Sequence, residues 1–207
     1  MNNWIEELYM PIYQPIEANK KLYVEAVIYN EVKSQYTEKE SEFIKANGLE
    51  TLYSSLTELR LHWKHRDKRE IQGTFHFYPV NRLMINWDED FGGHDWAPNM
   101  KGFRPLDMFY ESNGCVGFFV DRPDKTGLYL HAFESNVEPL NVDLEGYLKL
   151  LIVSKGFSWW QIVLVSHIKG THEAGLTQFR ESMPELFSNF DFDKFIELYE
   201  SVRIDKK

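Results

Sequence analysis

Apolar residues recur at helical spacing through the first third of the chain. Pro11 and Pro15 are expected to break any early helix, because proline has no amide proton and clashes with the preceding turn. A helix is therefore predicted between Glu17 and Tyr36, with these apolar positions three to four residues apart: Leu22, Ala26, Tyr29 and Val32.

Two further helices are predicted after this segment. Thr37 and Glu40 have the spacing of a capping box, in which the hydroxyl accepts from the Glu40 amide and the Glu40 carboxylate reaches back. This capping box is expected to begin a short helix that runs to Asn47. Gly48 is expected to end the helix, because glycine adopts left-handed dihedral angles at low cost. The helix after it carries one apolar stripe: Leu49, Leu52, Tyr53, Leu56, Leu59 and Trp63.

The middle of the chain changes to strand character. Residues 74–78 are short and aromatic, and Pro79 ends the run. Residues 83–87 fit either a second strand or a helical turn, and both alternatives stay open. Residues 116–120 and 128–133 are predicted strands on either side of a turn-rich loop, which indicates an antiparallel hairpin.

A short helix is predicted before this hairpin, over residues 105–112. Asn113 and Gly114 close it, since they separate a helical pattern from an aromatic strand. We therefore expect a positive φ at Gly114, and a clear loss of stability when valine replaces it.

Helical patterns return in the last third. Gly156 is expected to end the first of these helices, and Ser158 to cap the next. Pro184 suits the first turn of a helix, and Asp191 is expected to cap the last one. The first of these helices presents one apolar face: Leu144, Tyr147, Leu148, Leu151 and Ile152.

These patterns predict one α+β domain over residues 1–207, with a mixed, mainly antiparallel sheet, helices packed on it and helical N- and C-terminal flanks. Residues 1–70 form its helical N-terminal part, 71–157 its sheet-containing centre and 158–207 its helical C-terminal part. The chain has 43% hydrophobic and 15% aromatic residues, which is enough for a core and argues against general disorder.

The net charge limits the kinds of partner that the chain is expected to bind, and the cysteine content indicates the cellular compartment. The formal net charge of −9 repels phosphate backbones and attracts basic proteins, so direct nucleic-acid binding is not expected. A single cysteine, Cys115, excludes an internal disulfide and suits a reducing cytoplasm. The N-terminus lacks the pattern of a signal peptide, and polar residues interrupt the most apolar window, 148–168, so no membrane partner is expected.

The sequence offers few candidates for catalysis. Cys115, His131 and Asp107 are the residue types of a thiol hydrolase, yet nothing in their spacing brings them together. A lone cysteine is commonly a small buried hydrophobe. We therefore assign no catalytic residue and no cofactor, and keep a hydrolase or thiol enzyme using Cys115 and His131 as an alternative.

An acidic loop that also carries aromatic residues is the candidate for partner binding. Its spacing matches neither a calcium loop nor a zinc-protease helix, so no metal site is assigned. Aromatic anchors among polar residues are typical of protein interfaces, although the same aromatics also fit a core, and both interpretations stay open. The partner-binding candidates are Trp87, Asp88, Glu89, Asp90, Phe91, Asp95 and Trp96.

Part of the chain resembles a known family. Residues 104–114, Arg-Pro-Leu-Asp-Met-Phe-Tyr-Glu-Ser-Asn-Gly, resemble the Leu-Pro-x-x-Leu-x-x-Phe-Tyr-x-x-Asn-Gly helix of the SUKH superfamily. Residues 137–140 and 143–148 are similar to the closing strand and the Ser-Phe-x-x-Tyr-Leu helix of that family. The resemblance extends from about residue 75 to about residue 157.

The SUKH superfamily includes fungal cell-wall-synthesis regulators and bacterial immunity proteins of toxin systems. The resemblance thus implies a non-enzymatic α+β domain that binds and neutralises a cognate toxin, such as a nuclease or a deaminase. The acidic net charge agrees with a basic toxin as the partner. A regulatory scaffold protein remains a further alternative.

Overall fold

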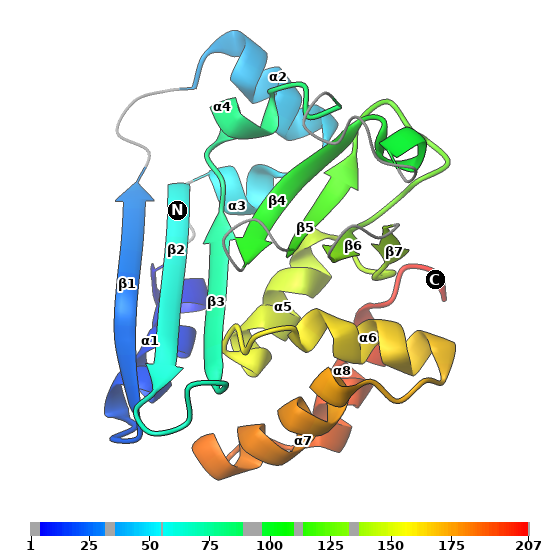
Figure 1. The fold of residues 1–207 in the computed structure, drawn as a ribbon. Coiled ribbons are helices and arrows are strands. Elements are labelled where there is room, and N and C mark those ends of the chain that lie inside the picture. Colours follow the sequence, from blue (N-terminus) through cyan, green and yellow to red (C-terminus); the bar gives the residue numbers. More distant parts are fainter. Residues whose placement is uncertain are drawn as a thin grey trace.

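The computed structural model describes residues 5–31, 36–54, 56–88, 97–109, 114–132 and 137–206. They form an α+β fold around an antiparallel sheet of seven strands, as the sequence predicts (Figure 1). The order of the strands in space follows their order in the chain. The strands are β1 (Leu22–Glu31), β2 (Leu56–His65), β3 (Gln72–Phe77), β4 (Phe103–Phe109), β5 (Gly114–Phe119), β6 (Tyr129–Ala132) and β7 (Glu138–Pro139).

The helices surround this sheet unevenly. In the view of Figure 1, α1 and α5 lie behind the sheet, and α6 and α7 lie below it. The α-helices are α1 (Met10–Ala18), α2 (Glu38–Ala46), α3 (Glu50–Tyr53), α4 (Val80–Leu83), α5 (Leu144–Ser154), α6 (Trp160–Lys169), α7 (Ala174–Leu186) and α8 (Phe192–Val202). A π-helical turn, η1 (Ile5–Tyr9), precedes α1, and a 3-10 turn, η2 (Ala97–Met100), precedes β4.

Strands β2 and β3 direct large apolar side chains toward α1 and α5, on what we call the inner face. Leu59 pairs with Phe77 and Leu61 pairs with Phe75, and all four side chains are at most 1% exposed. Alternate residues of a strand point to opposite sides, so this pairing fixes which residues are left for the other side.

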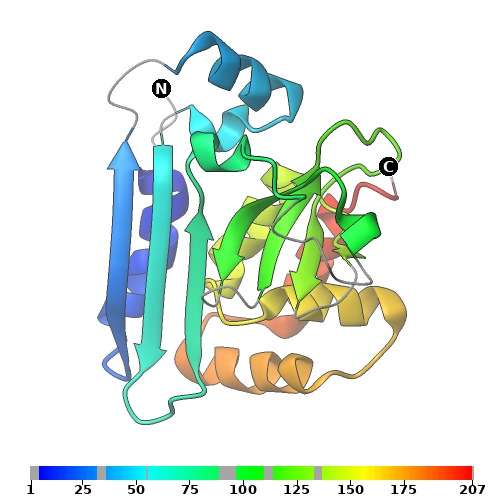
Figure 2. The same ribbon diagram turned by 45° about the horizontal axis from the view of Figure 1, so that its top comes forward.

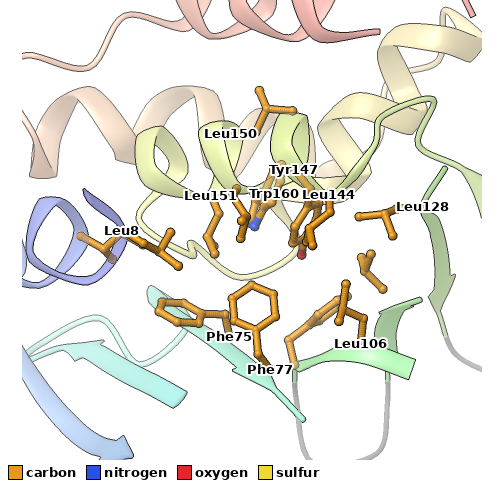
Figure 3. Close-up of a cluster of buried hydrophobic side chains, with 14 of the residues drawn as sticks. Leu8, Phe75, Phe77, Leu106, Leu128, Leu144, Tyr147, Leu150, Leu151 and Trp160 are labelled. Carbon is orange, nitrogen blue, oxygen red and sulfur yellow. The ribbon is translucent and has the colours of Figure 1, made fainter. Parts of the chain in front are cut away.

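Helix α5 closes the core over the inner face. Figure 3 shows Leu144, Tyr147 and Leu151 of α5 directed toward Phe75 and Phe77 of the sheet. These are the positions that helical spacing predicts, since residues three and four apart share one face. Burying each of these side chains contributes roughly 1.5–3 kcal/mol.

The half of the sheet formed by β4–β6 has a second apolar cluster, on the side opposite α5. Cys115 and Phe119 are adjacent in β5 to residues that face the inner core, so they point the other way. The cluster consists of Met100, Phe103, Cys115, Phe119 and Tyr129. This half of the sheet is therefore mainly apolar on both sides, with Asp107 and His131 as buried polar exceptions.

A buried polar network lies where the two halves meet. Asp107 of β4 is 0% exposed, and it pairs with Phe77 of β3. Its carboxylate accepts from the His76 amide and from the Tyr147 hydroxyl, each at 2.7 Å. Gln161 of α6 donates to the Tyr147 hydroxyl at 2.9 Å. Burial raises the pKa of Asp107 to about 6, although both hydrogen bonds favour the ionised form.

Several predictions for the N-terminal part are wrong. The segment predicted as helix, 17–36, holds β1, and the stripe predicted as helix after Gly48 holds α3 and β2. Residues 1–70 are therefore not a helical part. The aromatic and β-branched residues of β1 favour a strand once β2 lies beside them, and this pairing overrides local periodicity.

Proline does not break the first helix. Pro15 lies inside α1, where it removes the amide that would donate to the Pro11 carbonyl. Lys155 Nζ donates to that carbonyl at 2.8 Å instead. Pro184 likewise lies near the end of α7 and not in a first turn. Residues 80–83 form α4, so the segment 83–87 is not a second strand.

The predicted helix over residues 105–112 is also wrong, because residues 103–109 form β4. Gly114 opens β5, and it is not among the residues with positive φ. A side chain there would still be harmful for a different reason, since a Cβ atom would come within 2.7 Å of the Trp159 ring. Ser158 does not cap α6, whose first flanking residue is Trp159.

Other local predictions are confirmed. Thr37 and Glu40 form the predicted capping box before α2, and Gly48 has a φ of +65°. Asp191 caps α8 by accepting from the Lys194 amide at 3.1 Å. Strands β5 and β6 form the predicted antiparallel hairpin.

Candidate protein-interaction surface

The side of β1–β3 opposite the inner face, which we call the outer face, is polar in β2 and β3, while Ala26 and Ile28 of β1 also lie on it. No helix of the described residues lies over it, whereas α1 lies on the other side (Figure 1, Figure 2). The outer face follows from strand alternation, because its residues sit between the buried ones in β2 and β3. It carries Glu58, Arg60, His62, Lys64, Gln72, Thr74 and His76.

One set of contacts on the outer face is centred on Glu25 of β1. Its carboxylate lies 2.9 Å from His62 Nδ1 and 2.7 Å from Lys64 Nζ. A β-bulge between Val24 and Ala26 places this residue beside β2. Burial lowers the pKa of His62, while the Gln72 hydrogen bond and the Glu25 charge oppose that change.

A second set of contacts is centred on Glu58 of β2. Its carboxylate lies 2.8 Å from His76 Nε2 and accepts from Asn30 Nδ2 at 3.1 Å. Ion pairs at such partly exposed positions contribute only about 0–1 kcal/mol to stability. The polar outer face therefore does little for the fold.

An aromatic stack borders the outer face at the end of β3. The rings of Tyr78 and Trp87 lie 6.1 Å apart at an angle of 21°, and the His76 ring meets Tyr78 edge-on at 4.9 Å. The Trp87 indole donates to the Arg82 carbonyl at 3.0 Å. Both aromatic side chains are partly exposed, so a partner can reach them.

The structure describes only the beginning of the predicted partner-binding loop. Trp87 stacks on Tyr78, and Asp88 accepts from the Gly102 amide at 2.9 Å and lies 3.8 Å from Arg104 Nη1. The Asp88 carboxylate is therefore already engaged in contacts within the chain. The other predicted residues lie outside the described residues: Glu89, Asp90, Phe91, Asp95 and Trp96.

The thiol-enzyme candidates do not form a triad. Cys115 and His131 are register partners in β5 and β6, so their side chains share one side of the sheet. Asp107 pairs with Val116 and therefore points to the opposite side, toward Tyr147. Cys115 is 3% exposed, and burial raises the pKa of its thiol strongly. A thiol in this setting is protonated at neutral pH and a poor nucleophile.

The sequence interpretation missed the outer face because it assigned residues 49–63 to a helix. A signal was present: from Leu59 to Lys64, apolar and polar residues alternate strictly. Such alternation is typical of a strand with one buried side. It assigns Arg60, His62 and Lys64 to the opposite side from Leu61 and Trp63.

Other kinds of site find no support in the described residues. No group of three or more His, Cys, Asp or Glu side chains among them is arranged to hold a metal ion. None of their helices has the length and apolar character needed to cross a membrane. Comparison with known proteins found no matching family model, no matching curated protein and no matching solved structure.

Proposed function

We propose that this chain is a non-enzymatic protein-binding domain that uses the outer face and the Tyr78–Trp87 stack to contact its partner. One observation carries the proposal: the outer face of β1–β3 holds ordered polar side chains beside accessible aromatic rings, and no described helix covers it. Tyrosine, tryptophan and arginine are the residues that most often dominate binding at protein interfaces.

We further propose that the partner is a basic toxin domain, such as a nuclease, which the chain neutralises in the cytoplasm. The net charge of −9 supports this choice, because opposite net charges speed association. The SUKH resemblance supports it through the segments at 137–140 and 143–148, which lie in the β7 region and at the start of α5. The helix implied for residues 104–114 gives no support, since this segment contains β4.

The test is neutralisation of the protein encoded beside this one in its native genome. Co-expression of the two is expected to restore growth that the neighbouring product alone abolishes, and purified proteins are expected to form a stable complex. Association should slow as salt is added, because salt screens opposite charges. A neighbouring product that is not toxic, or whose toxicity is unchanged by this chain, contradicts the toxin assignment.

The predicted loop is tested within the same complex. Replacing Asp88, Glu89 and Asp90 by the corresponding amides is expected to slow association and flatten its dependence on salt. Stopped-flow association rates measured across a range of salt concentrations check this. Unchanged rates exclude the loop as the electrostatic contact while leaving the outer face as the binding surface.

A further inference from the structure

Two arginines, Arg60 of β2 and Arg82 of α4, make no direct ion pair with a carboxylate among the described residues. In the described part of the chain, the guanidinium groups of Arg60 and Arg82 make no hydrogen bond and no ion pair. Two arginines elsewhere in the molecule are paired: Arg104 of β4 lies near Asp88, and Arg122, after β5, lies 2.9 Å from Asp124. Arg60 is only partly exposed, and removing a charge from water is unfavourable unless a partner compensates.

The neighbours of Arg60 explain why it stays unpaired. Its register partners are Ile28 in β1 and His76 in β3. Glu58, two residues earlier on the same side, is already bound by His76 and Asn30. Glu58 and Glu25 are thus engaged in other contacts, and neither forms an ion pair with this guanidinium.

Both arginines act on the same aromatic residue. Arg60 is the register partner of His76, whose ring meets the Tyr78 ring edge-on at 4.9 Å. The Arg82 carbonyl accepts from the Trp87 indole at 3.0 Å. Burial raises the pKa of Tyr78, and the positive charges of Arg82 and Arg60 oppose that rise. The Tyr78 ring in turn stacks on Trp87. Arg60, Tyr78, Arg82 and Trp87 therefore form one group, which we call the arginine–aromatic cluster.

We infer that the arginine–aromatic cluster binds a carboxylate-bearing, acidic segment of the partner protein. A guanidinium matches a carboxylate with two parallel hydrogen bonds, and the aromatic rings supply apolar contact beside it. A nucleic acid fits less well, because it needs several cations along its backbone, and this cluster offers two. The inference rests on the proposed function, since it names the group that a protein partner presents.

The probe is a fluorophore-labelled octaglutamate peptide, with binding measured by fluorescence anisotropy at low salt. The double variant Arg60→Gln/Arg82→Gln is expected to weaken binding at least about tenfold. The control is Arg69→Gln/Arg180→Gln, which makes the same charge change at two exposed arginines in the β2–β3 turn and in α7. It is expected to bind the peptide like the wild type. Equal loss in both double variants, or no binding by the wild type, overturns the inference.

Two further measurements separate the alternatives. Arg60→Lys/Arg82→Lys keeps the charge and the fold but loses the paired geometry, so intermediate binding is expected. A labelled oligothymidylate that binds more tightly than octaglutamate, and only when both arginines are present, overturns the acidic segment in favour of nucleic acid. A toxin complex unchanged by Arg60→Gln/Arg82→Gln overturns the inference and leaves the proposed function intact. If the chain binds the peptide but does not neutralise a toxin, the proposed function is contradicted and the inference about the arginine–aromatic cluster still holds.

Discussion

The two halves of the sheet differ on the side away from α5. In β4–β6 that side is mainly apolar and buried, with Phe103 and Cys115 in a small cluster beside His131. In β1–β3 the corresponding side carries Glu58, Arg60 and His76 in partly exposed positions. One continuous sheet thus has a structural half and a polar half.

This difference separates the residues that maintain the fold from those available for binding. Apolar side chains on both sides of β4–β6 tie that half into the fold, and any change there should cost stability. The outer face of β1–β3 contributes little to stability, because its ion pairs are partly exposed. Replacements there should change binding and spare the fold.

The largest effect is expected from a core residue of the apolar half. Phe103→Ala should destabilise the protein by about 3–5 kcal/mol, because it removes a fully buried ring. Thr74→Ala, on the outer face of β3, is the matched change and should stay within about 0.5 kcal/mol of the wild type. Urea unfolding monitored by circular dichroism measures both. Similar losses for the two variants contradict the division of the sheet.

The free energy of unfolding should depend on pH through Asp107, which lies where the two halves of the sheet meet. The folded-state pKa of Asp107, about 6, exceeds the ordinary value of 3.8, so the folded protein binds this proton more tightly than the unfolded chain does. Stability should therefore fall as pH rises from about 4 to about 6, by roughly 2–3 kcal/mol, and stay level above that range. Asp107→Asn should lack this component.

The check is the difference in unfolding free energy between Asp107→Asn and the wild type at several pH values. The difference should favour the variant progressively as the pH rises. A difference that is constant between pH 4 and pH 7 shows that the carboxyl is not buried as described.

A smaller loss of stability is expected when Gly117, in the apolar half of the sheet, is replaced by a larger residue. A Cβ atom at Gly117 would lie 2.3 Å from the Arg104 carbonyl oxygen and 2.5 Å from the Phe103 ring. Gly117→Ala should therefore cost about 1–3 kcal/mol through overpacking. Thermal unfolding measures it, and an unchanged melting temperature means that this side of β5 has space.

The smallest effect is expected from the cysteine. Cys115→Ala should cost about 1 kcal/mol, because it removes one buried sulfur atom, and the proposed neutralisation of a partner toxin should be unaffected. Unfolding free energy and the growth assay check the two parts. Loss of neutralisation by a well-folded variant would support the thiol-enzyme alternative instead.

Local signals in the sequence predicted short-range structure well and strand partners poorly. The capping box at Thr37 and the cap at Asp191 depend only on neighbouring residues, and both are present. Strand β1 depends on a distant segment, because its partner β2 begins 25 residues after β1 ends. Its apolar positions also match helical spacing by chance, so the local pattern predicts a helix there. The helix predicted at 105–112 failed for the same reason, since β4 depends on β5.

The candidate surface shows the same limit. The aromatic and acidic pattern of the sequence predicts Trp87 as a binding residue; its ring stacks on Tyr78 beside the outer face, and its role in binding stays a prediction. Arg60 was not identified, because its role depends on which side of β2 it occupies and on Glu58 being bound to His76. Both facts come from strand pairing, which the apolar pattern of a single chain does not specify.

The most direct test of the account is to obstruct the outer face without altering its charges. Thr74→Trp places a large ring in the middle of that face, and Thr177→Trp places the same ring at an exposed position of α7. Affinity for the proposed protein partner, measured by calorimetry alongside the melting temperature, decides between the outcomes. The account predicts that Thr74→Trp melts like Thr177→Trp and binds at least about tenfold more weakly. Equal affinity of the two variants would contradict it.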